Sequence, residues 1–153
     1  MNTIKINLAI VLGLGVMLIL GTCATTKKAI SEESFFKTWS GTWVNTDIPG
    51  DDYVPQKIIC HPDGTHEIYR VATLSQKSCF HKITLIDQWA DSEGNIWYKA
   101  HKECLYHGVK GYEYGKIGDS GNTYELIYYI GSEPIEEWEP DNRFYYYCIY
   151  HRQ

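Results

Sequence analysis

The chain has 153 residues, with 14 basic and 19 acidic side chains and a formal net charge of −5 at neutral pH. Such a surface repels a phosphate backbone, so we expect no nucleic-acid partner. The length allows one domain beyond a targeting segment and leaves no room for a second.

The first 23 residues have the pattern of an export signal. Lys5 is the one charged residue among them, and Leu8 to Leu20 form a run of thirteen apolar residues and glycines. A bilayer span needs about 20 helical residues, so the run is too short to cross comfortably. It matches the hydrophobic region of a signal peptide. We therefore expect a signal peptide over 1–23, a tether over 24–30 and a folded domain over 31–153.

Leu20, Gly21, Thr22 and Cys23 resemble the lipobox of bacterial lipoproteins, although Thr22 stands where glycine, alanine or serine is usual. The resemblance implies that Cys23 carries a lipid and that the partner of the mature chain is a membrane. Ala24 is not the aspartate associated with inner-membrane retention, which favours the outer membrane or surface of the bacterial envelope. Secretory cleavage after Ala24 and an uncleaved anchor are the alternatives, and both also export the domain.

A short helix is expected over residues 31–39. Ser31 is a suitable N-cap, acidic residues follow it, and Gly41 ends the segment. A second short helix is expected from Ser132 to Trp138, because Pro134 suits a first helical turn and Pro140 ends one.

The rest of the chain predicts eight strands, rich in tyrosine, isoleucine, tryptophan and valine. They are expected over 41–46, 55–61, 65–72, 81–90, 95–104, 111–118, 122–130 and 143–152. Asp-Gly and Ser-Gly turns separate several of them, as in β-hairpins. The Gly118–Gly121 segment has the letters of a serine-protease nucleophile motif, but between two strands it is interpreted as a turn. No catalytic residue is assigned, and an enzyme is not expected.

Eight antiparallel strands form either a sandwich or a barrel, and only a closed barrel removes both exposed edges. We therefore predict an all-β, eight-stranded antiparallel up-and-down barrel with a short N-terminal helical turn. In such a barrel the first and last strands are neighbours, which brings Gly41 and Trp43 beside Arg152. That pair would make a cation–π contact and close one end of the barrel.

Gly41, Trp43 and Arg152 stand where lipocalins and the wider calycin group carry a glycine, a tryptophan and an arginine in their first and last strands. In this the chain resembles that group, including its compact bacterial lipocalin-like lipoproteins. The threonine-aspartate-tyrosine signature of classical lipocalins and their C-terminal helix are absent. The resemblance implies a barrel that binds a small, partly apolar ligand. The alternative is a structural or host-facing interaction protein whose barrel is filled. No cofactor is expected.

Thirteen tyrosines and five tryptophans supply rings for a core or a ligand wall. Because Glu125 is expected to face water, its neighbours Tyr124, Leu126, Tyr128 and Ile130 should face inward. With Tyr146 of the last strand, Tyr124, Leu126 and Tyr128 are the candidate ligand contacts.

Four cysteines follow Cys23, and an even number in an exported chain favours disulfides. Cys79 and Cys104 are the favoured pair, because the hairpin at 91–95 brings position 82 opposite Cys104. Without a Cys-x-x-Cys or His-Glu-x-x-His motif, no metal site is predicted. The six histidines are expected to be solvated or hydrogen-bonded.

Overall fold

A serine-capped helix starts the folded part of the chain. In the computed structural model, which describes residues 27–45, 55–70, 78–142 and 146–153, helix α2 spans Glu32–Trp39. Ser31 Oγ accepts a hydrogen bond from the Ser34 backbone N–H at 3.1 Å, which satisfies one of the free donors of the first turn. The predicted helical turn is therefore confirmed.

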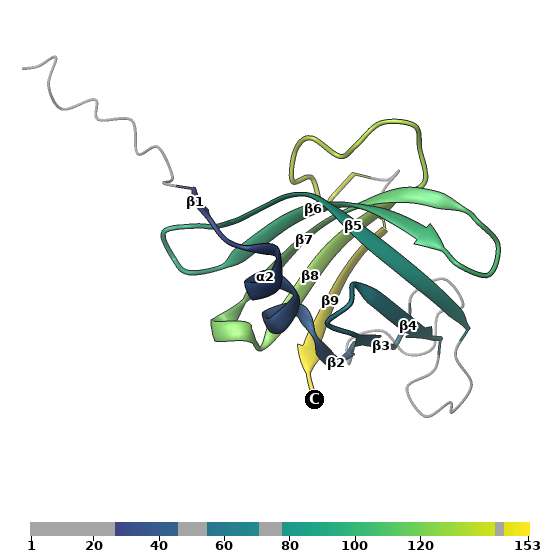
Figure 1. Ribbon diagram of the computed structural model, residues 1–153, viewed down its shortest axis with the longest axis horizontal. Coiled ribbons are helices and arrows are strands. Elements are labelled where there is room, and N and C mark those ends of the chain that lie inside the picture. Colours follow the sequence, from purple (N-terminus) through teal and green to yellow (C-terminus); the bar gives the residue numbers. More distant parts are fainter. Residues whose placement is uncertain (1–26, 46–54, 71–77, 143–145) are drawn as a thin grey trace, which may run out of the picture.

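Eight strands follow the helix, in the order expected from the turn residues (Figure 1). They are β2 (Gly41–Val44), β3 (Lys57–Cys60), β4 (Thr65–Tyr69), β5 (Cys79–Ala90), β6 (Ile96–Cys104), β7 (Lys110–Gly118), β8 (Thr123–Tyr129) and β9 (Tyr146–Arg152). The turn predicted at Gly118–Gly121 is the 3-10 turn η1 (Asp119–Gly121). The predicted strand ends at 46, 71–72 and 143–145 lie outside the described residues.

The strands close into a ring. Each pairs antiparallel with the next along the chain, and β2 pairs with β9, with Trp43 opposite Arg152. The predicted all-β, up-and-down barrel of eight antiparallel strands is thus confirmed. Closure leaves no free edge between the first and last strands, which is the physical advantage that favoured a barrel.

Strand β5 is longer than its neighbours and serves three partners. Its first four residues pair with β4, its last two pair with the two-residue strand β1 (Lys28–Ala29), and most of its length pairs with β6. Sequence reasoning gave residues 24–30 only as a tether, because two residues carry too little pattern to predict a strand. Within the described residues, no helix has the length and apolar character needed to cross a bilayer.

A β-bulge between Leu85 and Asp87 shifts the pairing of β5 with β6 by one residue. As a result His81, not position 82, lies opposite Cys104, so the predicted register was wrong by one. A bulge adds one unpaired residue to one strand, and the sequence gave no sign of it.

The second predicted helix, Ser132 to Trp138, is wrong. Residues 131–142 run as turns and extended chain along the outside of the barrel. Side chains of the barrel wall donate hydrogen bonds to backbone carbonyls of this segment: Tyr112 Oη donates to Ser132 O, and Lys99 Nζ donates to Glu136 O at 2.7 Å. Burial of Ile135 and docking of Trp138 against the outer face hold the segment there instead of a helix.

The barrel wall therefore carries an apolar cluster on each face. The inner cluster joins α2 to the interior of the barrel, and an outer cluster gathers under residues 131–142. The outer cluster comprises Trp89, Tyr114, Ile127 and Ile135, with Trp97, Tyr112, Tyr129, Trp138 and Tyr147 packed against it.

Candidate functional site

One end of the barrel is closed by the pair predicted from the sequence. The Arg152 guanidinium carbon lies 4.2 Å from the centre of the Trp43 ring. Arg152 also donates hydrogen bonds to the carbonyls of Thr38, Ser40 and Gly121, at 2.5, 2.9 and 2.6 Å. Gly41 is required beside it, because a Cβ at this position would lie 2.7 Å from Arg152 Nη1. Arg152 therefore ties α2, η1 and β2 together at this closed end.

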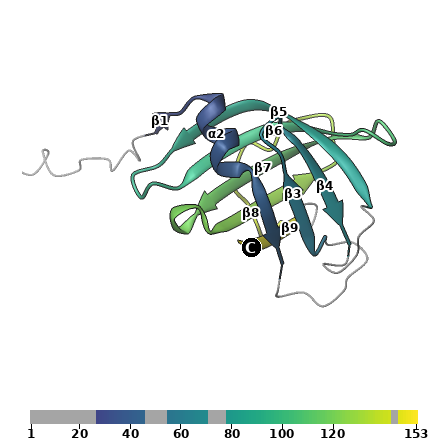
Figure 2. The same cartoon turned by 60° about the horizontal axis from the view of Figure 1, so that its bottom comes forward.

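Aromatic side chains fill the closed end. Helix α2 lies there (Figure 2), and its buried rings belong to the interior cluster. Trp43 Nε1 donates to the Trp39 carbonyl at 2.9 Å, and the Phe35 ring centre is 4.8 Å from that of Tyr98. Six of these large side chains are less than 2% exposed, namely Phe35, Trp39, Trp43, Tyr98, Tyr124 and Tyr150. A ligand has no space among them unless they move.

A buried ion pair lies above this aromatic floor. Lys102 Nζ is 2.6 Å from Glu113 Oε2, with Lys102 5% and Glu113 1% exposed. The other carboxylate oxygen of Glu113 accepts hydrogen bonds from the hydroxyls of Tyr98 and Tyr124, the latter at 2.8 Å. Both oxygens of Glu113 are thereby satisfied, as a buried charge requires.

The charge of Lys102 decides the ionisation of Glu113. Burial alone would raise the pKa of Glu113, but Lys102 and the hydrogen bonds hold that pKa below its usual range. Burial and the neighbouring carboxylate raise the pKa of Tyr98 and Tyr124 well above the usual tyrosine range, so both hydroxyls remain donors. In the described part of the chain, this interior network thus joins one cation, one anion and two fixed donors.

The four candidate ligand contacts divide into two pairs. Tyr124 and Leu126 are 1% and 4% exposed and belong to the packed interior. Tyr128 and Tyr146 lie toward the other end of the barrel, with ring centres 6.5 Å apart, and Tyr146 is 47% exposed. Lys102 Nζ lies 4.5 Å from the centre of the Tyr128 ring. Tyr128 therefore joins the buried ion pair to an exposed tyrosine at this open end.

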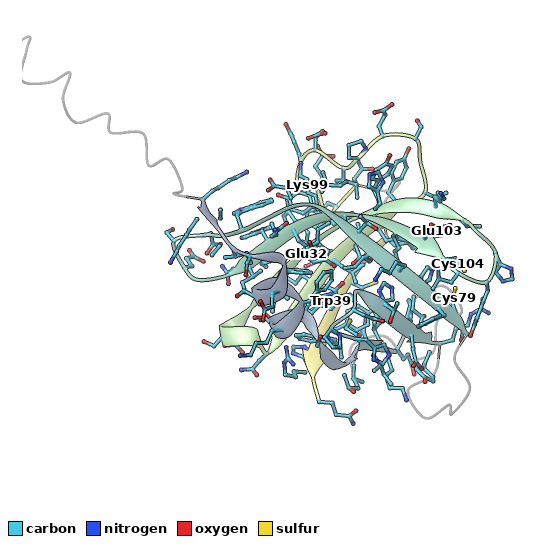
Figure 3. All side chains as sticks on the ribbon, viewed as in Figure 1. Glu32, Trp39, Cys79, Lys99, Glu103 and Cys104 are labelled. Carbon is cyan, nitrogen blue, oxygen red and sulfur yellow. The ribbon has the colours of Figure 1, made fainter. Side chains whose placement is uncertain are left out.

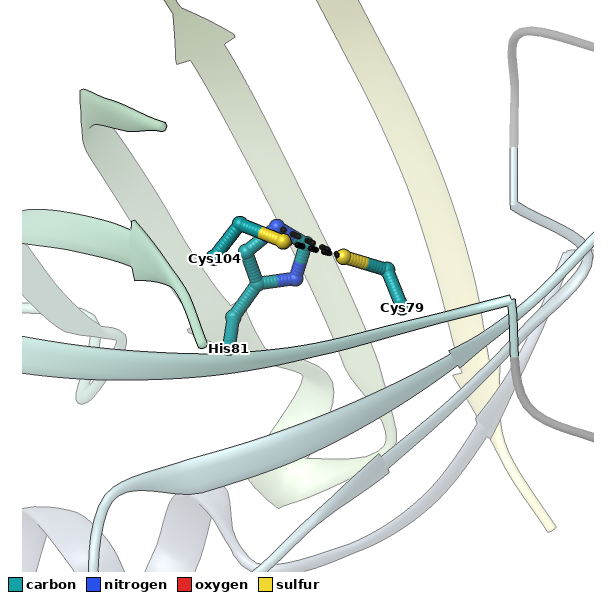
Figure 4. Close-up of side chains that lie close together, drawn as sticks. All are labelled: Cys79, His81 and Cys104. Atoms are coloured by element: carbon teal, nitrogen blue, oxygen red, sulfur yellow. Dashed lines mark hydrogen bonds between the residues drawn. The ribbon is translucent and has the colours of Figure 1, made fainter. Parts of the chain in front are cut away.

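A cluster of sulfur and imidazole groups lies at the same level of the barrel. Cys79 Sγ is 2.8 Å from Cys104 Sγ and 3.5 Å from His81 Nε2 (Figure 4). Figure 3 shows Cys79 and Cys104 together, away from Glu32 of α2. The pair favoured from the sequence is thus close in space, and both are free thiols in the structure. Their bonding state stays a prediction.

The cluster is part of a row that crosses four strands. Cys60 pairs with His66, His66 with His81, and His81 with Cys104, so the row runs from β3 to β6. All four side chains are buried. Cys79 lies two residues from His81 on β5 and on the same face.

The expectation of solvated or hydrogen-bonded histidines fails at His66, whereas the buried His81 keeps a hydrogen bond between its Nε2 and Cys79 Sγ. His66 is 1% exposed and His81 8%, and neither nitrogen of His66 has a hydrogen-bond partner among the described residues. Burial lowers the pKa of His66 well below its usual value and that of His81 to about 3, so both rings are neutral at neutral pH.

Sequence reasoning missed Lys102, Glu113, His66 and His81. A signal existed for Lys102, because every second residue of β6 lies on the same face, and this face also carries Tyr98, Ala100 and Cys104. No local signal links Lys102 to Glu113, which lie on different strands.

A concavity of about 240 Å³ is present on the outer face of β5 and β6. Its lining residues other than Lys102 alternate with the buried Ile83, Ala100 and Lys102, which places the concavity outside the barrel. The residues around it are Lys82, Thr84, His101, Lys102, Glu103 and Lys110.

No known protein-family model, curated protein or solved structure matches this chain.

Proposed function

We propose that this protein is a lipid-anchored barrel of the bacterial cell envelope that binds one small molecule with an apolar body and a polar group. The observation that carries the proposal is the Lys102–Glu113 ion pair inside the barrel. Apolar side chains of similar volume usually fill such a position at no loss of stability. A charged pair kept at the level of the open end is suited to recognising a polar ligand group.

The binding position follows from the packing. The aromatic floor leaves the open end for the ligand, where Tyr128 and Tyr146 offer ring faces to an apolar body. Below them, the ammonium of Lys102 lies against the Tyr128 ring and can turn toward an anionic or carbonyl oxygen.

Lipid attachment rests on the lipobox resemblance at Leu20 to Cys23. Labelling of expressing cells with a radioactive fatty acid tests it. We expect the wild-type chain and the matched control Cys148→Ala to carry label, and Cys23→Ala to carry none. Equal labelling of Cys23→Ala would remove the anchor from the proposal.

Ligand binding is tested by native mass spectrometry of the full chain, extracted from membranes in a mild detergent. We expect an additional mass of one small molecule, reduced in Tyr128→Ala and Tyr146→Ala. Tyr106→Ala is the matched control, because Tyr106 is 50% exposed and its ring lies 6.5 Å from that of Phe80, on the outward side of β5. A chain without any bound molecule, or equal loss in the control, would contradict the proposed site.

The rival function is an envelope interaction protein with a filled barrel. The packed aromatic floor favours it, and so does the outer concavity, which is smaller than the roughly 300 Å³ of a usual ligand pocket and is not lined by tyrosines. This function predicts that native spectra of the wild-type chain contain protein and detergent only.

A further inference from the structure

The sulfur and imidazole groups of β5 and β6 form an arrangement that the proposed ligand site does not use. One donor atom from each of Cys79, His81 and Cys104 lies within 4.8 Å of the other two. We propose that these three residues bind one thiophilic metal ion of the zinc type, with His66 as the fourth ligand.

The distances suit such an ion. With Zn–S near 2.3 Å and Zn–N near 2.05 Å, tetrahedral coordination separates sulfur from nitrogen by about 3.6 Å and two sulfurs by about 3.8 Å. Cys79 Sγ and His81 Nε2 are 3.5 Å apart, so they need no adjustment. The two sulfurs, now at 2.8 Å, separate by about 1 Å, which rotation of two side chains can supply.

The chemistry of the ligand groups also suits a metal. Zinc-type ions bind neutral imidazole nitrogen and deprotonated cysteine sulfur, the two kinds of donor that Cys79, His81 and Cys104 supply. Binding releases the two thiol protons to solvent and forms two metal–sulfur bonds.

The fourth ligand is indicated by burial without hydrogen bonding. The ring centre of His66 is 5.2 Å from that of His81, directly across the β4–β5 pair, and the ring has to turn toward the other three donor atoms to join them. A buried polar group without a partner destabilises a fold by roughly 1–3 kcal/mol, and a metal–nitrogen bond removes that penalty.

Charge balance allows the ion to be buried. Two thiolates neutralise a divalent cation, and the neighbouring Lys102 and Glu113 neutralise each other. An entry path exists because Cys79 is only partly buried, at the start of β5. Thiolate and imidazole together select zinc-type and other soft cations over magnesium or calcium.

The test uses the full chain in detergent, reduced with a phosphine and kept free of oxygen, with Co²⁺ as the probe. We expect one Co²⁺ per chain, a thiolate-to-cobalt charge-transfer band, the visible bands of tetrahedral cobalt, and loss of all bands on adding Zn²⁺. Loss of a supporting hydrogen bond alone weakens metal sites by about 10–100-fold, so Cys79→Ser, Cys104→Ser and His81→Gln should each weaken binding by at least about 100-fold.

Cys148→Ser is the matched control, because Cys148 is buried on β9 outside the row, and it should bind like the wild type. His66→Phe should keep the thiolate band but bind at least about tenfold more weakly, whereas unchanged affinity would remove His66 from the ligand set. Since a variant can fail to fold, alkylation of the wild type is measured as well, and Zn²⁺ should protect Cys79 and Cys104 together.

The same two sulfurs are the disulfide pair favoured from the sequence, and a disulfide excludes the metal. An intact mass lower by two hydrogens that persists in the phosphine, or absence of cobalt bands from the reduced and folded wild type, would overturn the metal site. Neither result would affect the proposed ligand site at Tyr128 and Tyr146.

Discussion

Removing the cation of the buried ion pair should destabilise the barrel strongly. In Lys102→Met, the Glu113 carboxylate keeps its two tyrosine donors but loses its only close cation among the described residues. Breaking a buried pair from one side usually lowers the free energy of unfolding by about 3–5 kcal/mol. That is a large part of the total of about 5–15 kcal/mol available to such a domain.

The loss should depend on pH. In the wild type, Lys102 lowers the pKa of Glu113, so the stabilisation is present above the unfolded-state pKa of about 4.3 and is lost as pH falls through the folded-state value. In Lys102→Met, burial dominates and raises the pKa of Glu113. The variant should therefore gain stability relative to the wild type as pH falls from 7 toward 5, because Glu113 takes up a proton.

The assay is urea unfolding of the purified chain, followed by tryptophan fluorescence at several pH values. The double variant Lys102→Met/Glu113→Gln should recover most of the loss, because no buried charge remains and the glutamine oxygen still accepts from the tyrosines. Lys110→Met is the matched control, since Lys110 and Glu103 are exposed and 3.9 Å apart, and it should change stability by less than about 1 kcal/mol. A Lys102→Met loss under 1 kcal/mol that does not vary with pH would refute this reasoning.

Substitutions at three further positions test how the barrel is held together. Arg152→Met should lower the free energy of unfolding by about 2–4 kcal/mol, because the contact with Trp43 and charged hydrogen bonds to three carbonyls are lost; a urea midpoint equal to that of the wild type would argue against Arg152 as the closing residue. Gly115→Ala should destabilise the barrel by about 1–3 kcal/mol, because the new Cβ would lie 2.2 Å from the Tyr98 ring. A calorimetric melting temperature at or above that of the wild type would show that the ring can move freely. Ser31→Ala should lower the free energy of unfolding by about 1 kcal/mol, because α2 loses its N-cap, whereas Ser31→Asp should keep the cap and the wild-type stability. Equal stability of the two variants in chemical unfolding would exclude a capping role.

Turn chemistry and strand composition made most of the fold predictable. Asp, Ser and Gly residues between runs of β-forming residues marked the hairpins, and a hairpin fixes which strands are neighbours. The second helix was wrong because Ser132 to Trp138 has a helical start signal but lies against the outer aromatic cluster, whose contacts outweigh a weak local preference.

The candidate sites were less predictable. Tyr128 was expected to face inward from the alternation along its strand, because inward and outward positions repeat every two residues, and Tyr146 was named with it without that support. The two buried histidines were missed, since whether an imidazole meets water or packed rings depends on distant elements. For His66 these are Trp39 of α2 and His81 of β5.

The sequence by itself determined the number of barrel strands, their order and the pair that closes the ring, Trp43 and Arg152, because these features follow from local turns and from the two ends of one chain. Only the tertiary structure decided which side chains meet inside. The bulge in β5 sets His81 opposite Cys104, and closure of the ring buries Lys102 against Glu113. A register shift of one residue moves a side chain to a new partner, and no pattern within a single strand records it.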